Sequence, residues 1–298
     1  MKNWRYALIA CCLFQSASLF AWNGLGHRLI AQIAYNHLTP HAKRTFNYYN
    51  RALDKVYKPQ KLVNAAAWLD YFRYQDVSWF NSMHYIDIAF SEDGSPLPPL
   101  AGINAVWAID QAQQTLLSRR ATDFDKGFAL RILLHVTGDV HQPLHAATRI
   151  SARFPQGDRG GNQLMLGKNA VAANLHGYWD RGAGLLVGYH PYAELNKMAA
   201  EFEKAWPCNP LEMNKNAGHW AQESHQLALT VAYKIKDKEI PDTQYQQRAQ
   251  DVVSKRIALA GCRLAAVLNQ IDETLVQQST QKKSRYPSTR ARTRSSIK

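Results

Sequence analysis

Pairs of histidine and aspartate four positions apart are the most informative feature of this 298-residue sequence. On a helix, residues four apart face the same side, so an imidazole and a carboxylate can reach one ion. A lone histidine is usually packed or solvated, and a single pair is often an ion pair. Two pairs, one of them in a run with two further histidines, favour metal binding instead. They are His135/Asp139, in HVTGDVHQPLH with His141 and His145, and His176/Asp180, in NLHGYWD.

Three earlier segments add residues of the same chemical type. They are WNGLGH from Trp22 to His27, AWLD ending at Asp70, and MHYID, which contains His84 and Asp87. Histidine and carboxylate ligands suit zinc, and clustered ions can neutralise a phosphodiester and ionise water near neutral pH. The sequence contains no glycine-rich phosphate loop, nucleophile elbow or Cys–His arrangement that would compete with this interpretation.

The segments that must position these residues are expected to be helical. Apolar residues recur at helical spacing in most of the chain from Trp22 to Gln278, which predicts a mainly α, single-domain multi-helix bundle. The expected helices are 30–38, ended by Pro40, then 101–120, 129–140, 217–235 and 245–275. Loops are expected at 91–99 and 153–162, and the only candidate strand is 83–88.

The two ends of the chain differ from the middle. Residues 1–21 have a charged start, a short apolar stretch and small residues before Trp22, as in a signal peptide. That stretch is too short to span a bilayer, so an exported protein, periplasmic or secreted, is expected. Residues 279–298 are basic and lack apolar periodicity, which predicts a disordered tail. Without both ends, the formal net charge of +13 falls to +4 on residues 22–278.

Cysteine usage agrees with export. Cys11 and Cys12 belong to the predicted signal peptide, which leaves Cys208 and Cys262 in the mature chain. An even pair in an exported protein suggests one disulfide bond, although sequence alone cannot show that the two residues meet. Neither cysteine lies in a cluster of the kind that binds metal.

Taken together and in order, the motifs resemble the zinc-dependent S1/P1 nuclease family, from Trp22 to about Asp272. They are WNGLGH, AAWLDYFR, HYID, LLHVTGDVHQPLH, GGN and NLHGYWD. The resemblance implies the helical fold that this family shares with zinc phospholipase C. It also implies hydrolysis of single-stranded DNA or RNA to 5′-phosphorylated products, with 3′-nucleotidase activity. The expected partners are therefore single-stranded nucleic acid and 3′-nucleotides.

The resemblance also implies three Zn²⁺ ions and nine ligand residues. Trp22 would bind the first ion through its free amine and its carbonyl, together with His27, and Asp139 would bridge this ion to the second. The remaining ligands would be Asp70, His84 and His135 for the second ion and His145, His176 and Asp180 for a third, more exposed one. His141 lies inside the motif but matches no family ligand. Gly24 and Gly26 are expected to give the turn between Trp22 and His27 its freedom to close.

Further positions match roles other than metal binding. Asp70 would also orient or deprotonate the attacking water. Arg73 would contact the scissile phosphate, a task that suits a guanidinium fork, unless it is an ordinary surface arginine. Tyr85 would stack on a base whose edge Asp87 hydrogen-bonds, and Asn162 would be a further residue of that base pocket. The alternative for these last three residues is a role in packing or turns.

Two other functions remain open at the level of sequence. A zinc phospholipase C shares the fold and the N-terminal tryptophan ligand, but it spaces its first histidine farther from the tryptophan and uses His-x₃-Glu, where this chain has His176-x₃-Asp180. A helical nucleic-acid-binding or adhesion protein with structural zinc is the alternative from another class. Structural zinc sites are usually closed and rich in cysteine, which argues against it.

Overall fold

The computed structural model describes residues 22–73, 78–188 and 190–285 of the chain, and most of these residues are helical. The signal peptide predicted for residues 1–21 and the last thirteen residues of the predicted tail lie outside the described residues. The α-helices are α1 Gly24–His37, α2 Pro40–Arg51, α3 Leu62–Ala65, α4 Trp68–Arg73, α5 Ala105–Leu117, α6 Asp123–Val140, α7 Leu175–Asp180, α8 Tyr192–Ala205, α9 Ala217–Leu227 and α10 Thr243–Arg285.

Short segments connect these helices. The 3₁₀ segments are η1 Ser78–His84, η2 Pro143–His145, η3 Gly182–Gly184 and η4 Pro210–Glu212, and a π-helical turn, η5 Ala228–Ala232, follows α9. Two three-residue strands, β1 Ala89–Ser91 and β2 Thr148–Ile150, pair in parallel with Ala89 opposite Thr148. The mainly α fold expected from the apolar periodicity is therefore confirmed.

Polar side chains fix where the helices begin. The side chains of Asn23, Thr39, Asn104 and Asn174 each accept a backbone hydrogen bond in the first turn of α1, α2, α5 and α7. Thr122 forms a capping box at the start of α6. Such caps satisfy N–H groups that have no partner within the helix. The cap at Thr122 starts α6 six residues before the apolar segment expected from residue 129.

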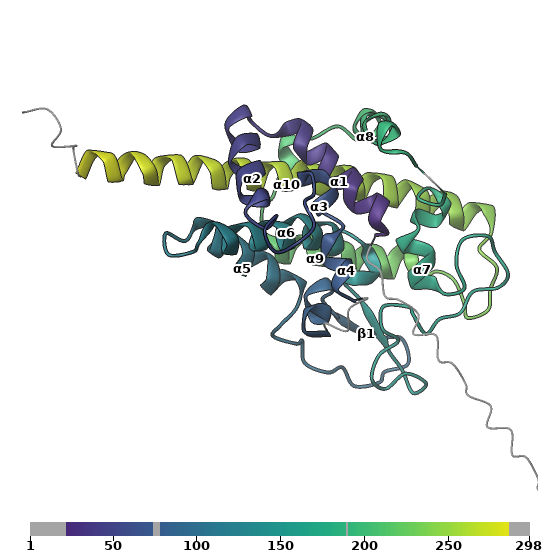
Figure 1. Cartoon of the computed structure of the whole chain (residues 1–298). Helices are drawn as coiled ribbons and strands as arrows, with labels where there is room; N and C mark the ends of the chain where they lie inside the picture. Colours follow the sequence, from purple (N-terminus) through teal and green to yellow (C-terminus); the bar gives the residue numbers. More distant parts are fainter. Residues whose placement is uncertain (1–21, 74–77, 189, 286–298) are drawn as a thin grey trace, which may run out of the picture.

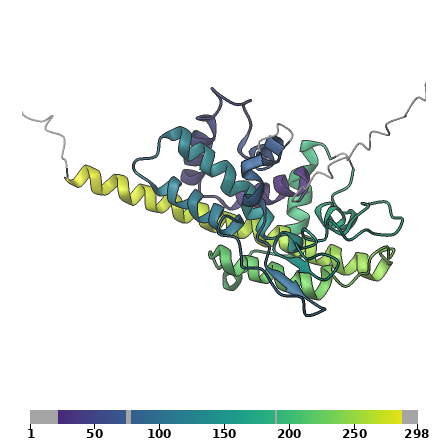
Figure 2. The same ribbon diagram turned by 90° about the horizontal axis from the view of Figure 1, so that it is seen from below.

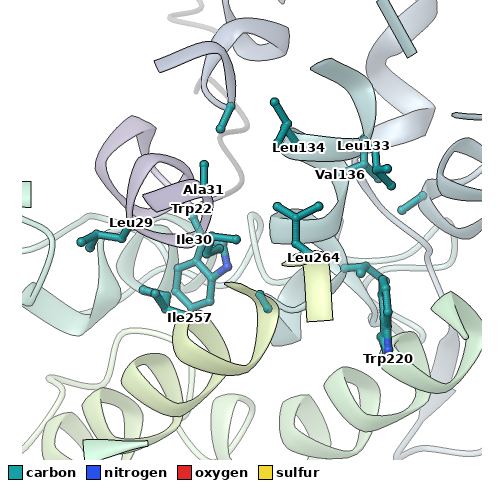
Figure 3. Packing of buried hydrophobic residues seen from close by; sticks show 14 of the residues in the cluster. Trp22, Leu29, Ile30, Ala31, Leu133, Leu134, Val136, Trp220, Ile257 and Leu264 are labelled. Atoms are coloured by element: carbon teal, nitrogen blue, oxygen red, sulfur yellow. The ribbon is translucent and has the colours of Figure 1, made fainter. Parts of the chain in front are cut away.

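The core lies where α1, α6, α9 and α10 meet. α1 packs against α10 and α8, while α6 packs against α5 and α2. Figure 3 shows buried side chains from these elements converging, with Trp22 among the largest fully buried ones. α10 has 43 residues and extends beyond the rest of the fold in both ribbon views (Figures 1 and 2). Among the described residues, no helix is both long and apolar enough to cross a membrane.

Three details of the fold differ from the expectations drawn from the sequence, and a fourth expectation, the disulfide bond, is confirmed. α1 ends at His37, and Pro40 opens α2 instead of ending α1. The predicted strand 83–88 is wrong, because Met83 and His84 belong to η1 and the strand begins at Ala89. α10 continues to Arg285, so the predicted disordered tail is helical for its first seven residues. Cys208 and Cys262 form the suggested disulfide bond, which ties the segment after α8 to α10.

Candidate metal centre

Helix α6 supplies the central residues of the site. His135 and Asp139 lie one turn apart and are fully buried, and His135 Nε2 is 3.4 Å from Asp139 Oδ2. α1 brings His27 to the same place, with Nε2 3.3 Å from Asp139 Oδ1. This approach depends on Gly138, because a Cβ atom there would lie 2.8 Å from His27 Nδ1. His27, His135 and Asp139 thus form one group of buried ligand atoms.

A second group shares His135 with the first. Asp70 comes from α4 and His84 from the end of η1, two short elements that follow one another in the chain. His84 Nδ1 lies 3.1 Å from Asp139 Oδ2 and 4.0 Å from Asp70 Oδ1. His135 Nε2 lies 3.6 Å from Asp70 Oδ1. Asp139 lies beside residues of both groups, and a carboxylate in that place is the arrangement expected for two neighbouring ions.

The third group combines η2 with α7. His145, His176 and Asp180 offer ligand atoms that all lie within 4.8 Å of one another. His176 Nε2 is 3.2 Å from His145 Nε2 and 3.5 Å from Asp180 Oδ2. All three side chains are at most 7 % exposed. This group is therefore buried like the others, and what distinguishes it is that His145 and His176 line a pocket.

Backbone carbonyls orient three of the histidines. The Nδ1–H of His135 donates to the Ala66 carbonyl at 2.7 Å, that of His145 to the His84 carbonyl at 2.6 Å, and that of His176 to the Gly160 carbonyl at 2.8 Å. Such bonds fix the neutral tautomer and direct the Nε2 lone pair into the group. His84 is different, because it faces Asp139 and His135 through Nδ1.

Trp22 and Asn23 join the elements that carry the ligands. The indole N–H of Trp22 donates to the carbonyl of Gly138, the residue before Asp139. The Asn23 backbone N–H donates to the Asp180 carbonyl, and its side chain donates to the Leu186 carbonyl. Trp22 is fully buried. The first described residues thus lie between α6 and α7, beside the first and third groups.

The role expected for Gly24 and Gly26 is wrong. Both lie inside α1, so there is no turn between them that needs conformational freedom. Gly26 serves close packing instead, because a Cβ atom there would lie 2.7 Å from the Cβ of Trp22. Conformational freedom matters at Gly160, which has φ +59° and whose Cβ would lie 2.3 Å from the Leu144 carbonyl oxygen. Gly160 thereby places the carbonyl that holds His176.

The donor set of these groups fits divalent transition-metal ions. The three groups contain imidazole nitrogens and carboxylate oxygens, with no cysteine. Such buried, mutually close polar atoms suit zinc better than magnesium or calcium, which prefer oxygen ligands alone. Two of the carboxylates, Asp70 and Asp139, lie within about 4 Å of the same two histidines, His84 and His135. Bound cations would balance their charge.

A pocket of about 370 Å³ adjoins the third group. His145 and His176 line it together with all three residues expected to contact a base, Tyr85, Asp87 and Asn162. The Asn162 amide donates to the Arg159 carbonyl at 2.7 Å, which sets its orientation. Arg73 ends α4, three residues after Asp70, but its side chain lies outside the described residues.

One carboxyl group of the pocket lining, that of the half-buried Asp87, has a shifted pKa. Burial, and next the nearby Asp158 carboxylate, raise the pKa of Asp87 to about 6. Asp158 is fully buried and accepts hydrogen bonds from the backbone of Arg149 and Gly161 and from the Tyr233 hydroxyl. Asp158 therefore holds the GGN loop in shape from behind the pocket.

His141, although part of the same motif, faces away from the three groups. Its Nδ1–H donates to the Thr137 carbonyl, and its Nε2 accepts from Arg263 at 3.1 Å. Burial, followed by the charges of Arg256 and Arg263, lowers its pKa well below the ordinary value. A neutral histidine with both ring nitrogens engaged has no lone pair left for a metal ion.

Comparison with known proteins agrees with this arrangement. A sequence model of the family described as S1/P1 Nuclease matches residues 22–273. The chain belongs to the S1/P1 nuclease family. It is 28 % identical to Endonuclease 1 of Arabidopsis thaliana, over 89 % of this chain and 90 % of that protein. It is 25 % identical to Nuclease P1 of Penicillium citrinum and 24 % identical to Nuclease S1 of Aspergillus oryzae, over 84 % and 85 % of this chain and 97 % and 92 % of those proteins.

The S1/P1 assignment makes the chain a nuclease, a hydrolase of phosphoester bonds. In this S1/P1 nuclease, several residues of the site were not predictable from its motifs. Gln142 donates to Asp180 Oδ1 at 2.7 Å, and Asn81, Gln156 and Arg159 line the pocket. Only Gln142 had a signal in the sequence, since it lies within HVTGDVHQPLH. Asn81 comes from η1, and Gln156 and Arg159 come from a loop, and the place of all three depends on the tertiary fold.

Proposed function

We propose that this S1/P1 nuclease is a zinc-dependent phosphodiesterase that hydrolyses single-stranded DNA or RNA to 5′-phosphorylated products and also removes 3′-phosphates from nucleotides. The observation that carries the proposal is the pocket that joins the third ligand group to Tyr85, Asp87 and Asn162. A base held there would place its phosphate beside His145 and His176. Single strands would be favoured because the base must be unstacked to enter.

The ligand residues divide among three ions. Trp22 through its backbone and His27 would hold one ion, Asp139 would bridge it to a second held by Asp70, His84 and His135, and His145, His176 and Asp180 would hold the third. When bound, zinc supplies hydroxide near neutral pH and neutralises charge on the phosphate. This division is supported by the three groups of mutually close ligand atoms.

The chain's own residues would bind and orient the substrate. The ring of Tyr85 would stack on the base, and the carboxyl group of Asp87 would hydrogen-bond its edge. An Asp70 carboxylate oxygen would hold or accept a proton of the attacking water, which its position between His84 and His135 supports. Arg73, three residues along the same short helix, would contact the phosphate with two N–H groups.

Metal analysis of the mature protein, combined with assays on three substrates, tests the proposal. We expect about three zinc ions per chain, cleavage of single-stranded DNA, release of phosphate from a 3′-nucleotide, and no turnover of phosphatidylcholine. Excess chelator should abolish both activities, and added zinc should restore them. Full activity in a sample shown to be free of metal would refute the proposal, and preferential hydrolysis of phosphatidylcholine would indicate a phospholipase.

A matched pair of carboxylate variants tests the site itself. Asp180→Asn preserves the shape of the side chain and an oxygen that can accept from Gln142, but it removes the charge from the third group. Asp251→Asn makes the same change on an exposed position of α10. We expect the first variant to lose zinc and activity and the second to retain both.

A further inference from the structure

A second depression, the basic groove, lies away from the metal centre, between α1, α2 and the start of α3. Its volume is about 710 Å³. Its lining includes Lys43, Arg44 and Arg51 from α2 and Lys61, which precedes α3, together with the rings of Tyr35 and Tyr48. No carboxylate is among its lining residues. Figure 1 shows these helices next to one another, in purple and blue.

The sequence of α2 directs its cationic groups to one side. Arg44, Tyr48 and Arg51 follow one another at intervals of four and three residues, so they share a face of the helix. Arg44, Tyr48 and Arg51 are exposed. In the described part of the chain, Arg44 and Arg51 form no ion pair, and Lys43 lies over the Tyr35 ring at 5.0 Å. Positive charge is therefore available to a ligand.

Positive charge also predominates in the part of the sequence that forms the groove. The first acidic residue of the whole sequence is Asp54. Residues 22–69 contain seven lysines and arginines and one acid, a net charge of +6, whereas residues 70–278 contain 20 basic and 22 acidic residues, a net charge of −2. The positive excess of the folded body thus resides in the segment that builds the basic groove.

Two nearby acids, Asp123 and Asp54, form no ion pair with Arg44 or Arg51 in the described part of the chain. Asp123 accepts a hydrogen bond from the Tyr48 hydroxyl, which leaves the face of that ring free to stack. Asp54 lies 4.0 Å from the fully buried guanidinium of Arg131, on the side of the core. Within the described residues, the exposed guanidinium groups of Arg44 and Arg51 are therefore not compensated by an ion pair, a condition that favours capture of a polyanion.

Two elements that line the groove also lead to the metal centre. Gln32 in its wall lies five residues after His27, about 7.5 Å farther along the axis of α1. Leu62 and Val63, which also line it, precede Ala66, whose carbonyl orients His135. The same two elements thus connect the groove to the ligands of the first two groups.

We infer that the basic groove binds the phosphate backbone of a single-stranded nucleic acid several nucleotides away from the bond that is cut, an inference that rests on the proposed function. Cationic side chains would contact phosphates, and Tyr48 would stack on a base, as in other proteins that bind single strands. A flexible strand can follow a recess between helices, whereas a duplex is stiff and an anionic membrane is flat. The groove is therefore an exosite that favours long substrates.

The test compares two double variants of the metal-loaded enzyme. Arg44→Gln with Arg51→Gln removes two exposed cations of the groove, and Lys168→Gln with Arg248→Gln removes two exposed cations elsewhere. We measure kcat/KM on a dinucleotide and on a single strand of about 25 nucleotides, longer than the ~4–16 nucleotides that one binding module covers. We also measure binding of an uncleavable phosphorothioate strand by fluorescence anisotropy.

The groove variant should keep dinucleotide kcat/KM within about twofold and lose on the order of tenfold on the long strand at low salt. Its plot of log affinity against log salt should be shallower by about 1.4, since each single-strand contact contributes about 0.7. The control variant should match the wild type in every assay. Equal effects of the two variants, or a groove variant that loses only binding to phosphatidylserine vesicles or to duplex DNA, would overturn the inference.

The two proposals fail in different ways. If the wild type cuts no nucleic acid, the proposed function is wrong, but the anisotropy measurement still reports whether the groove holds a single strand. If the wild type cuts both substrates and the groove variant binds the phosphorothioate strand as tightly as the wild type, the exosite is absent and the proposed function stands.

Discussion

At the level of single residues, His135 combines several structural roles in the site. It belongs to two of the three ligand groups, stacks on the ring of His27 with centroids 3.8 Å apart, and donates to the Ala66 carbonyl. Asp180 belongs to one group, whose two histidines line the pocket. Replacing His135 should therefore reduce the stability of the fold as well as turnover, whereas replacing Asp180 should reduce mainly turnover.

We expect His135→Ala to lower the free energy of unfolding by roughly 2–4 kcal/mol even in chelator, because it opens a cavity and leaves a buried carbonyl without its donor. Asp180→Asn should leave the melting temperature in chelator nearly unchanged while turnover with zinc falls on the order of a hundredfold or more, since a metal ion contributes several kcal/mol to the transition state. Urea denaturation and initial rates measure the two effects. Equal stability losses in both variants would contradict this division.

Asp87 gives a second prediction at this scale, for the metal-free protein. Its folded-state pKa of about 6 lies above the value of about 3.9 expected when unfolded, so ionisation of this carboxyl group disfavours folding as the pH rises between these values. Asp87→Asn should therefore be more stable than the wild type at pH 7, and the difference should shrink towards pH 4. Urea denaturation in chelator across this range measures it. A difference that does not change with pH would show that Asp87 ionises normally.

At the level of elements, an ionic network of two buried arginines and the half-buried Glu223 fixes α9 and α10 behind the site. Glu223 on α9 accepts hydrogen bonds from Arg256 and Arg263 on α10, at distances of 2.6–2.8 Å. Arg263 also donates to Nε2 of His141 at the end of α6, and Arg256 donates to the His141 carbonyl. The network thus connects the two helices to the segment between Asp139 and His145.

Glu223→Gln should destabilise the protein at pH 7 by roughly 1–3 kcal/mol, because it leaves two buried guanidinium groups without their counter-charge. Burial alone would raise the pKa of Glu223, but hydrogen bonds from Arg263 and Arg256 bring it down to about 2. A depressed carboxylate pKa contributes stability above the unfolded value of about 4.3, and this contribution is lost as the pH falls towards 2. The difference in free energy of unfolding between variant and wild type should therefore become smaller as the pH falls from about 4.3 to about 2, as measured by urea denaturation. A gap of constant size would exclude the ionic explanation.

The elements also show what the sequence could predict. Long helices with an apolar stripe, such as α6 and α10, were evident from periodicity, and the spacing of His135 and Asp139 correctly implied one helix face. α4 and α7 have only six residues each, too few for periodicity to identify them, although they carry Asp70 and Asp180. Asp70 was identified from its residue type and motif resemblance, and Asp180 also from its spacing to His176, whereas the orienting carbonyls and Asp158 came only from tertiary structure.

At the level of the whole molecule, the N-terminal segment connects folding to processing. Trp22 and Asn23 are held by Gly138, Asp180 and Leu186, so these first described residues are fixed beside the ligand groups. The sequence predicts a signal peptide that ends at Ala21. If it is removed, the nitrogen of Trp22 is an amine and no longer an amide.

The last prediction follows from that change of chemistry. An amide nitrogen has no available lone pair, whereas an α-amine has a pKa of about 7.7–8.0 and can lose its proton to a metal ion. A protein with one extra residue before Trp22 should therefore fold, bind less zinc than the mature form and lose most of its turnover. Mass spectrometry, metal analysis and initial rates check these outcomes, and removal of the extra residue by an aminopeptidase, as a control on the same sample, should restore both zinc and activity. The hydrogen bonds of the Trp22 indole and of Asn23 involve no terminal amine, so both forms should keep them and melt at similar temperatures in chelator. Full zinc content and full activity in the extended protein would show that the amine is not a ligand, and the first ion would then depend on the Trp22 carbonyl, His27 and Asp139.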